Sequence, residues 1–276
     1  MELRYFADPV RVAAMNTEQL RKEFLIESLF TPNEIKLIYC DVDRAVVGSA
    51  VPGKSPLELS AASELRASYF AERREIGVLN IGAGGKVTVD DKVYPMQNTD
   101  CLYIGRGSRK ITFASDDGGS PAQFYLISYP AHTAYPTTLA SKAQAAAVQL
   151  GTEPDCNRRT LYKYIHLEGI KSCQLVMGFT QLQSGSAWNT MPPHTHARRT
   201  EVYMYFNLAP TARVFHFMGQ PQETRHLLVA DKQVAISPSW SIHCGAGTSH
   251  YAFCWAMGGE NQTFDDMDAA PVATLR

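Results

Sequence analysis

Two histidines and a glutamate lie within eight residues of one another in the stretch "MPPHTHARRTEVYMYF". The spacing is His194-x-His196-x4-Glu201, and His243 comes about 40 residues later in "SPSWSIHCG". Because side chains two residues apart in an extended chain point the same way, the first two histidines can present both rings to one side of a sheet. Three neutral imidazole nitrogens and one carboxylate suit a divalent transition metal and leave room for a water or substrate oxygen.

A polar loop that leads into a strand is the alternative interpretation of this stretch. A lone His-x-His pair is common in surface turns, but here a glutamate, a preceding Pro-Pro and a downstream Pro-x-Trp-x-x-His accompany it. We therefore predict a metal site. Two further histidines, His226 and His250, are candidates for its rim, and structural or surface roles are expected for His132, His166 and His216.

Short runs of alternating or β-branched residues must position these side chains. A first series comprises "IKLIYCDVDRAVVG", "EIGVLNIGAGGKVTVDDKVYPM", "DCLYIGRGSRKITFAS" and "AQFYLISYP". A second comprises "TLYKYIHL", "CQLVMGFTQLQSG", "TEVYMYFNL", "ARVFHFMG", "HLLVADKQVAIS" and "YAFCWAMGG". Gly, Asp and Asn separate the runs at strand-and-turn spacing. Many short strands with few helices predict an all-β protein of the sandwich or barrel type.

One helix is expected near the N-terminus. Asn16 can cap it, with Gln19 three residues on, as in a capping box. Apolar residues then pair at i,i+4 spacing, which predicts a helix that continues through residue 30. These pairs are Leu20 with Phe24, Leu25 with Leu29, and Ile26 with Phe30.

A segment rich in Pro, Thr and Ala separates the two series of strands and marks a boundary. We predict an N-terminal domain over residues 1–135, a linker over 136–157 and a C-terminal domain over 158–276. The alanine run in the linker is expected to form a short helix.

The two halves also resemble each other. Laying "AERRE" on "ARRTE" matches Glu75 with Glu201, each at the head of a strand, and sets Ser68 and Phe70 against the two histidines. An internal repeat of this kind keeps the carboxylate in the N-terminal half and lacks both imidazoles. We therefore expect only the C-terminal half to hold metal.

Composition bounds the class of protein. The chain has 276 residues, 45% apolar and 19% charged, with a formal net charge of −1. A buried core is feasible, and neither nucleic acid nor an anionic membrane is expected as a partner. Apolar runs are too short to span a membrane and the N-terminus lacks a signal pattern. The six cysteines are widely spaced without a CxxC pair, which is typical of reduced thiols in a cytoplasmic protein.

Longer motifs carry a family resemblance. The His-x-His-x4-Glu pattern with a strand-borne histidine resembles the cupin metal motif, and two strand series resemble a bicupin. Over nearly the whole chain, "YKYIHLEG", "KSCQLVMGFTQL", "WNTMPPHTHARRTEVYMYFNL", "MGQPQETRHL", "ISPSWSIHCGAGTSHYAFCWAMGGENQTFDDMD", "RREIGVLNIGAGG" and "LYIGRG" resemble the 5-keto-4-deoxyuronate isomerases of pectin breakdown. The resemblance implies an all-β bicupin of two jelly-roll barrels with a short N-terminal helix.

What the family does gives further expectations. The resemblance implies a cytoplasmic ketol-isomerase that converts 5-dehydro-4-deoxy-D-glucuronate to 3-deoxy-D-glycero-2,5-hexodiulosonate. It implies one Zn²⁺ per chain, bound by His194, His196, Glu201 and His243, and a homo-oligomer, most often a hexamer. The expected partner is the small keto-deoxyuronate substrate, with no nucleic acid and no membrane.

Such a reaction needs groups that move protons and a cation for the substrate carboxylate. Tyr203 and Tyr205 share the strand side of Glu201, and Arg199 shares it too if the strand extends backwards. Tyr203, Lys163 and Glu260 are the candidates for proton transfer; Arg199, Arg225 and Tyr205 are those for substrate contacts. Each has a plainer interpretation, as core tyrosine, strand-surface lysine, turn acid or solvated arginine.

Three other functions fit the same pattern. They are the 5-deoxyglucuronate isomerase of inositol breakdown, a metal-dependent cupin dioxygenase, and a non-enzymatic sugar-binding or storage bicupin. The intact four-ligand set in one half argues against the last of these, since storage needs no open metal.

Overall fold

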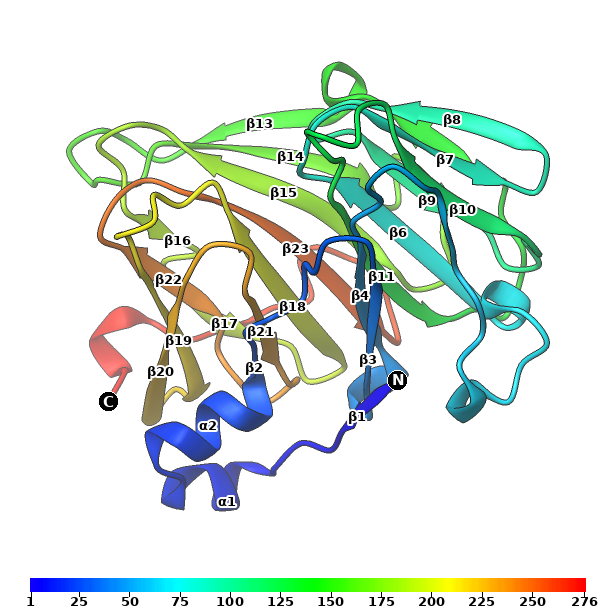
Figure 1. Ribbon diagram of the computed structural model, residues 1–276. Coiled ribbons are helices and arrows are strands. Elements are labelled where there is room, and N and C mark those ends of the chain that lie inside the picture. The colour runs from blue at the N-terminus through cyan, green and yellow to red at the C-terminus, as the bar shows by residue number, and fades with distance from the viewer. The chain divides into compact units, whose positions relative to one another are not determined.

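A computed structural model describes all residues from 1 to 276 (Figure 1). The chain forms two compact units, which do not follow a single cut in the sequence. The first comprises Met1–Arg4, Leu29–Ala146 and Tyr164–Met177, and the second comprises Tyr5–Ser28, Ala147–Lys163 and Gly178–Arg276. We predicted domain boundaries at residues 135 and 158. They stay a prediction, because each compact unit is made of segments from both sides of these boundaries.

The first unit contains two antiparallel layers and one parallel edge pair. Its larger sheet has the order β1 (Glu2–Arg4), β3 (Ile35–Cys40), β4 (Val46–Ala50), β11 (Phe124–Pro130), β6 (Arg74–Asn80), β9 (Cys101–Ile104), β12 (Thr138–Ala140). Its smaller sheet has the order β5 (Leu57–Glu58), β10 (Ile111–Ser115), β7 (Gly85–Val89), β8 (Lys92–Met96). The apolar side chains of both sheets, among them Val78, Val87, Phe113 and Phe124, form one buried core.

The strands of the second half repeat this order. The larger sheet runs β13 (Ala146–Leu150), β14 (Arg159–Ile165), β15 (Val176–Leu182), β23 (Ala252–Gly259), β18 (Arg199–Phe206), β21 (Val234–Ser237), β2 (Leu25–Ile26). The smaller runs β16 (Trp188–Asn189), β22 (Cys244–Gly247), β19 (Val214–Gln220), β20 (Glu223–Val229). Strand β6 therefore corresponds to β18 and β11 to β23, which supports the internal repeat. The chain is an all-β bicupin, as the sequence predicts.

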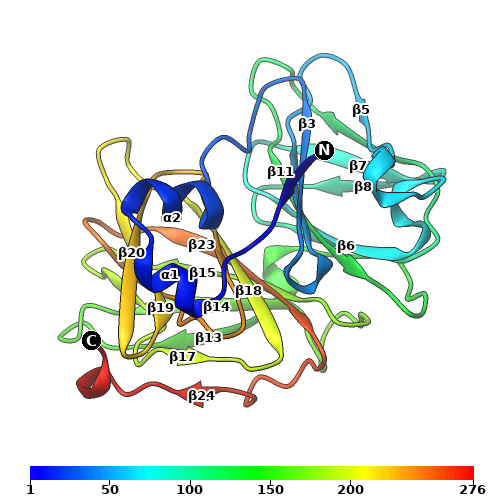
Figure 2. The same ribbon diagram turned by 90° about the horizontal axis from the view of Figure 1, so that it is seen from below.

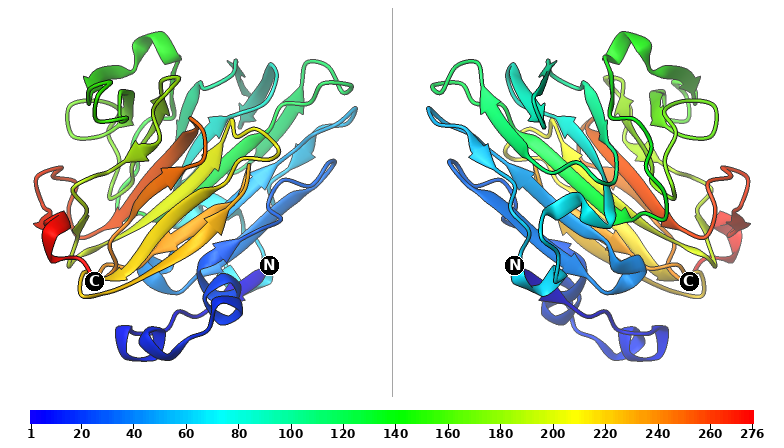
Figure 3. Two further views of the ribbon diagram at one scale, coloured as in Figure 1. Left: turned by 90° about the vertical axis from the view of Figure 1, so that its left-hand side faces the viewer. Right: turned by 90° about the vertical axis from the view of Figure 1, so that its right-hand side faces the viewer.

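Strand β18 lies in the interior of the larger sheet of the second unit. Its neighbours in the sheet are β23 and β21 (Figure 3). Glu201 lies opposite Met257 on β23 and Ser237 on β21. All eight of its residues are buried. Alternate side chains of a central strand enter the space between the two sheets, so this strand can carry polar groups into an enclosed site. A further pair of short strands, β17 (His194–Thr195) and β24 (Asp268–Ala269), brings the C-terminal segment alongside (Figure 2).

Two helices precede these strands and pack on the second unit, beside β19 and β20 (Figure 2). They are α1 (Pro9–Ala14), capped by Asp8, and α2 (Thr17–Phe24), in which Asn16 and Gln19 form the predicted capping box. Single 3₁₀ turns lie at Val42–Arg44, Ser63–Leu65, Phe70–Glu72, Lys142–Gln144 and Val272–Thr274. None of the helices is long and apolar enough to cross a membrane.

Two local predictions were wrong. The helix ends at Phe24 rather than continuing to residue 30, because Leu25 and Ile26 pair with β21 as strand β2. The alanine run forms strand β13 instead of a helix and lies beside β14. In both places a sheet edge supplies hydrogen bonds that outweigh weak local helix preference. All six cysteines are free thiols, in agreement with the sequence.

Candidate metal centre

Four side chains from three places in the second unit converge on one point. His194 lies on β17, His196 is two residues further along, Glu201 lies on β18, and His243 immediately precedes β22. The Nε2 atom of His194 is 3.1 Å from that of His196 and 3.0 Å from that of His243. Glu201 Oε2 is 3.2 Å from His196 Nε2 and 2.6 Å from His243 Nε2. The structure thus brings together the whole predicted ligand set.

The four atoms comprise one carboxylate oxygen and three imidazole nitrogens, a set that could hold a cation. Burial, with the neighbouring His243 adding to the effect, lowers the pKa of His194 to about 3, so this imidazole is neutral near pH 7. Burial alone would raise the pKa of Glu201, but interactions with His243 and His196 outweigh it and hold that pKa well below its ordinary value. The carboxylate is therefore ionised in a buried place. Positive charge among these atoms would stabilise it.

The spacing fits a coordinated metal ion. Ligand atoms about 2.0–2.2 Å from one ion, at angles near 90–110°, lie roughly 3.0–3.5 Å apart. Most of the distances above fall near that range. Glu201 Oε2 is buried and receives no hydrogen bond of acceptable geometry, although His196 and His243 are in ion-pair range. A buried oxygen without a donor, facing three imidazole nitrogens, is an arrangement that a bound cation would complete.

A backbone carbonyl orients one of the imidazoles. His196 Nδ1 lies 2.6 Å from the carbonyl oxygen of Asp266, to which it donates in the tautomer that leaves Nε2 free for a metal. Arg199 Nη2 donates to the same oxygen at 3.1 Å. The predicted substrate contact Arg199 is thus fully buried beside His196, where it holds the Asp266 carbonyl rather than reaching the cavity.

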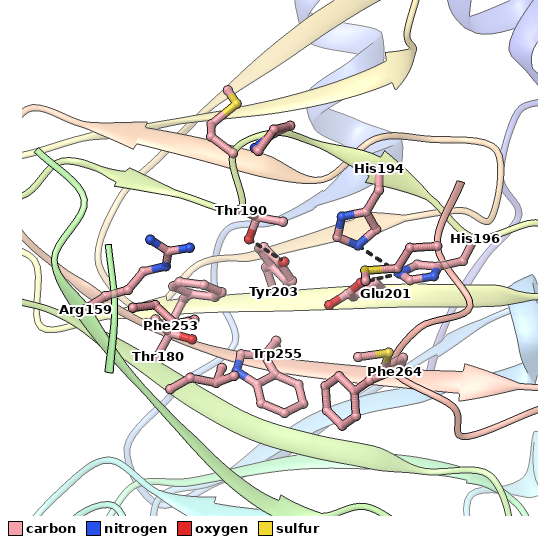
Figure 4. Close-up of a pocket in the computed structure, with 16 residues that line it drawn as sticks. Arg159, Thr180, Thr190, His194, His196, Glu201, Tyr203, Phe253, Trp255 and Phe264 are labelled. Atoms are coloured by element: carbon pink, nitrogen blue, oxygen red, sulfur yellow. Dashed lines mark hydrogen bonds and ion pairs between the residues drawn. The ribbon is translucent and has the colours of Figure 1, made fainter. Parts of the chain in front are cut away.

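A cavity of about 380 Å³ opens beside the cluster (Figure 4). His194, His196 and Glu201 form part of its lining, whereas His243 does not. Aromatic and aliphatic side chains make up most of the wall, including Phe253, Trp255, Phe264 and Met267. An apolar enclosure with a few convergent polar groups is typical of a small-molecule site.

Tyr203 and Thr190 stand between the cluster and the far side of the cavity (Figure 4). Their hydroxyl oxygens are 3.2 Å apart. Thr190 has φ of +53°, a left-handed conformation that is rare for a β-branched residue. Burial and the nearby Glu201 raise the pKa of Tyr203 well above 10, so its hydroxyl stays protonated and can donate a hydrogen bond.

Tyr205 lies deeper in the same layer and does not line the cavity. Its hydroxyl is 2.8 Å from His216 Nδ1, and His216 Nε2 is 3.2 Å from Ser237 Oγ. Burial lowers the pKa of His216 to about 3, with His243 adding to the effect. His216 is therefore a neutral core residue with a hydrogen-bond partner at each ring nitrogen. The sequence predicts a structural role of this kind for it.

Several other candidates lie away from the lining. Lys163 places its ammonium 5.2 Å from the ring centre of Phe264, and Glu260 is exposed. Arg225 bonds Glu223 and the carbonyl of Ala13 from its place on β20. The two rim histidines, His226 and His250, are exposed and also outside the lining.

The cavity contains polar residues that the sequence did not indicate. The most distinctive is Arg159, at the start of β14. One signal was available, because Arg159, Leu161 and Lys163 alternate on one side of this strand, and Lys163 was a candidate. The Asp266 carbonyl gave no signal, since a backbone group carries no residue identity.

Comparisons with known proteins bear on the whole chain. A profile of the KduI/IolB family matches residues 24–272. Proteins from Halalkalibacterium halodurans and Lachnoclostridium phytofermentans, each named 4-deoxy-L-threo-5-hexosulose-uronate ketol-isomerase, are 53% identical over 276 residues and match over the full length of both chains. The crystal structure of an IolB-like protein from Salmonella typhimurium shares the fold, with a TM-score of 0.72 at 13% identity over 87% of this chain and 94% of the other.

Proposed function

The chain belongs to the KduI/IolB family, and on that premise we propose that it is a 4-deoxy-L-threo-5-hexosulose-uronate ketol-isomerase. Identity of 53% over the full length of relatives with that name supports the activity. The observation that carries the proposal within this chain is the four-residue cluster that opens into an apolar cavity. We assign the metal to His194, His196, Glu201 and His243, with zinc as the ion.

The proposed reaction converts 5-dehydro-4-deoxy-D-glucuronate to 3-deoxy-D-glycero-2,5-hexodiulosonate in pectin breakdown. A carbonyl and a hydroxyl exchange places on adjacent carbons as one hydrogen moves between them. We place the protein in the cytoplasm, and its free thiols support this assignment.

Each group of the cavity has a part in this chemistry. A bound zinc ion would supply Lewis-acid polarisation of the substrate oxygens. Tyr203, neutral and held by Thr190, donates a hydrogen bond to an oxygen on which negative charge develops. The apolar walls around Phe253 and Trp255 exclude water and strengthen these interactions. Arg199 and the Asp266 carbonyl keep His196 in the orientation that the cluster needs.

A direct assay tests the activity. Purified metal-replete protein is incubated with 5-dehydro-4-deoxy-D-glucuronate, and the product is identified by NMR. In parallel, 5-deoxyglucuronate tests the sister activity, which the likeness to an IolB-like structure brings into consideration. We expect kcat/KM to be far higher on the first substrate. Turnover of only the second, or oxygen consumption in an oxygen electrode, would refute the assignment.

The identity of the metal has its own test. Metal-free protein is reconstituted with Zn²⁺, Mn²⁺ or Fe²⁺ and assayed at equal occupancy. Imidazole-rich sites accept several of these ions, with Zn²⁺ bound more tightly than Mn²⁺ or Fe²⁺. We expect Zn²⁺ to restore activity and to be the ion retained on purification. Restoration by Fe²⁺ alone would disprove the zinc assignment.

We also propose that the chain assembles as a homo-oligomer, a hexamer in the form that the family resemblance implies. An exposed apolar row crosses the sheet β16-β22-β19-β20, where Trp188, Ala246, Phe215 and Leu228 lie side by side. Rows of this kind are frequent at subunit contacts. Light scattering should give a multiple of the mass of one chain at working concentration, and the mass of a single chain would refute the proposal.

A further inference from the structure

Arg159 is a guanidinium without a carboxylate partner. Its one hydrogen bond runs from Nη1 to the carbonyl oxygen of Asn157 at 2.8 Å, and no ion pair involves it. The side chain is half-buried in the wall of the cavity. A cation in such a place loses hydration without gaining a counter-charge, which costs free energy unless a ligand supplies the anion.

The other arginines near the site lie outside the lining of the cavity. The Nε and Nη1 atoms of Arg199 have no hydrogen-bond partner, but this side chain is fully buried away from the cavity. Arg199 holds the Asp266 carbonyl from behind His196, and Arg225 pairs with Glu223. Among the residues that line the cavity, Arg159 is the one lysine or arginine. It is therefore the group of the cavity best suited to bind an anionic ligand.

Its position matches the shape of a uronate. In Figure 4 the guanidinium lies at one side of the cavity and the His194, His196 and Glu201 cluster at the other, with Tyr203 between them. A hexosulose-uronate carries its carboxylate at one end of a six-carbon chain and the aldehyde and adjacent hydroxyl at the other. Across the cavity the order of polar groups is therefore Arg159, Tyr203 and the metal cluster. A bound uronate can place its carboxylate at Arg159 and its aldehyde and adjacent hydroxyl at the cluster.

We propose that Arg159 binds the substrate carboxylate and so determines which end of the chain meets the metal cluster. This inference rests on the proposed ketol-isomerase activity and gives it a specificity determinant that is absent from the ligand set. The planar guanidinium can form a two-point, charge-assisted contact with a carboxylate. Tyr203 and the cluster then receive the reacting oxygens.

Kinetics on a pair of substrates test the proposal. One substrate is the uronate, and the other is the same hexosulose with a hydroxymethyl group in place of the carboxylate. The variants are Arg159→Gln and Arg159→Lys, with Arg158→Gln as the matched control. Arg158 is the preceding arginine and is exposed, with only a surface contact to Glu153.

Hydrogen bonds to a charged group contribute enough that Arg159→Gln should lower kcat/KM for the uronate roughly 10- to 100-fold. It should leave kcat/KM for the neutral analogue within about twofold, since that molecule offers no carboxylate. Arg159→Lys, which keeps the charge but not the planar fork, should fall between wild type and Arg159→Gln. Inhibition by the product, which also carries a carboxylate, should weaken by a similar factor in Arg159→Gln.

The outcomes separate this inference from the function on which it rests. Wild-type protein that fails to isomerise the uronate contradicts the proposed function. Active wild type with equal losses on both substrates in Arg159→Gln would make the arginine structural, and no loss on either would remove it from the site. Melting curves of all variants accompany the kinetics, and Arg159→Lys provides the test if Arg159→Gln does not fold.

Discussion

Glu75 and Glu201 occupy equivalent positions on β6 and β18, yet their surroundings are opposite in kind. Glu75 accepts hydrogen bonds from the hydroxyl of Tyr103 and from the N–H groups of Cys173, Gln174 and Leu175, at 2.7–2.9 Å. Glu201 faces the Nε2 atoms of His196 and His243. One carboxylate is thus saturated by hydrogen-bond donors, and the other lies beside two imidazole nitrogens with which it could share a metal ion.

The difference shows how one repeated carboxylate takes two roles. In the first unit, Glu75 fixes the loop between β14 and β15 by meeting its N–H groups. In the second, Glu201 instead faces imidazole rings, and together these side chains could hold a metal ion. The residue before β10 is the exposed Lys110, whereas the residue before β22 is His243. The same residue type thus has two roles. The surrounding side chains and N–H groups make Glu75 a structural anchor and Glu201 a candidate metal ligand.

The largest expected effect comes from metal removal. A chelator should abolish turnover without unfolding the chain, because each unit has an extensive apolar core that does not depend on the ion. Activity and circular dichroism, measured before and after dialysis against the chelator, check this expectation. Melting of the protein at assay temperature on loss of the metal would show that the cluster is structural.

Glu75→Gln should mainly affect stability. A buried amide presents its NH₂ group to donors, so part of the network around the loop is lost, at a cost of about 3–5 kcal/mol. The melting temperature should fall by on the order of 10 °C, while the metal content of the folded protein is unchanged. If Glu75→Gln melts like wild type but loses its metal, the ion is bound in the first unit, which contradicts its assignment to the second.

Glu201→Gln should show the reverse pattern. The amide oxygen still coordinates weakly, but the site is one negative charge short, and loss of such an element costs on the order of a hundredfold in rate. Its melting temperature should change less than that of Glu75→Gln. Steady-state kinetics on metal-replete samples check the rate, and full activity would mean that Glu201 is only a neighbour of the site.

Tyr203→Phe should have the smallest of these effects. It removes one hydroxyl that stays protonated at neutral pH, because burial raises its pKa. We expect a loss of roughly tenfold in kcat with little change in melting temperature, as for one hydrogen bond to a developing charge. An unchanged rate with a lower melting temperature would instead mark it as a core tyrosine.

Features carried by side-chain types at short spacing could be predicted from the sequence. The ligand cluster could be derived from two residues on one strand side, a carboxylate at a strand head and one downstream histidine, and the capping box of Asn16 and Gln19 from two side chains. The strand β2 could not, because Leu25 and Ile26 continue a helical pattern until β21 offers them a partner.

Contacts between residues far apart in the sequence could not be predicted for a related reason. The Asp266 carbonyl reaches His196 from 70 residues away, and its partner is a backbone atom that any residue would supply. Arg159 precedes the predicted strand "TLYKYIHL" and was not a candidate, and only the folding of β14 beside β15 brings it into the wall of the cavity. Equally, nothing in the sequence around Glu75 shows that a loop nearly 100 residues later supplies its hydrogen bonds.

Metal content per chain tests the central distinction between the two halves most directly. Elemental analysis of purified wild type should give one divalent ion per chain, with zinc as the metal. The His196→Ala, His243→Ala double variant should contain none and should melt near the wild-type temperature. Two ions per chain in wild type, or metal retained in the double variant, would contradict the assignment of a single centre to the second half.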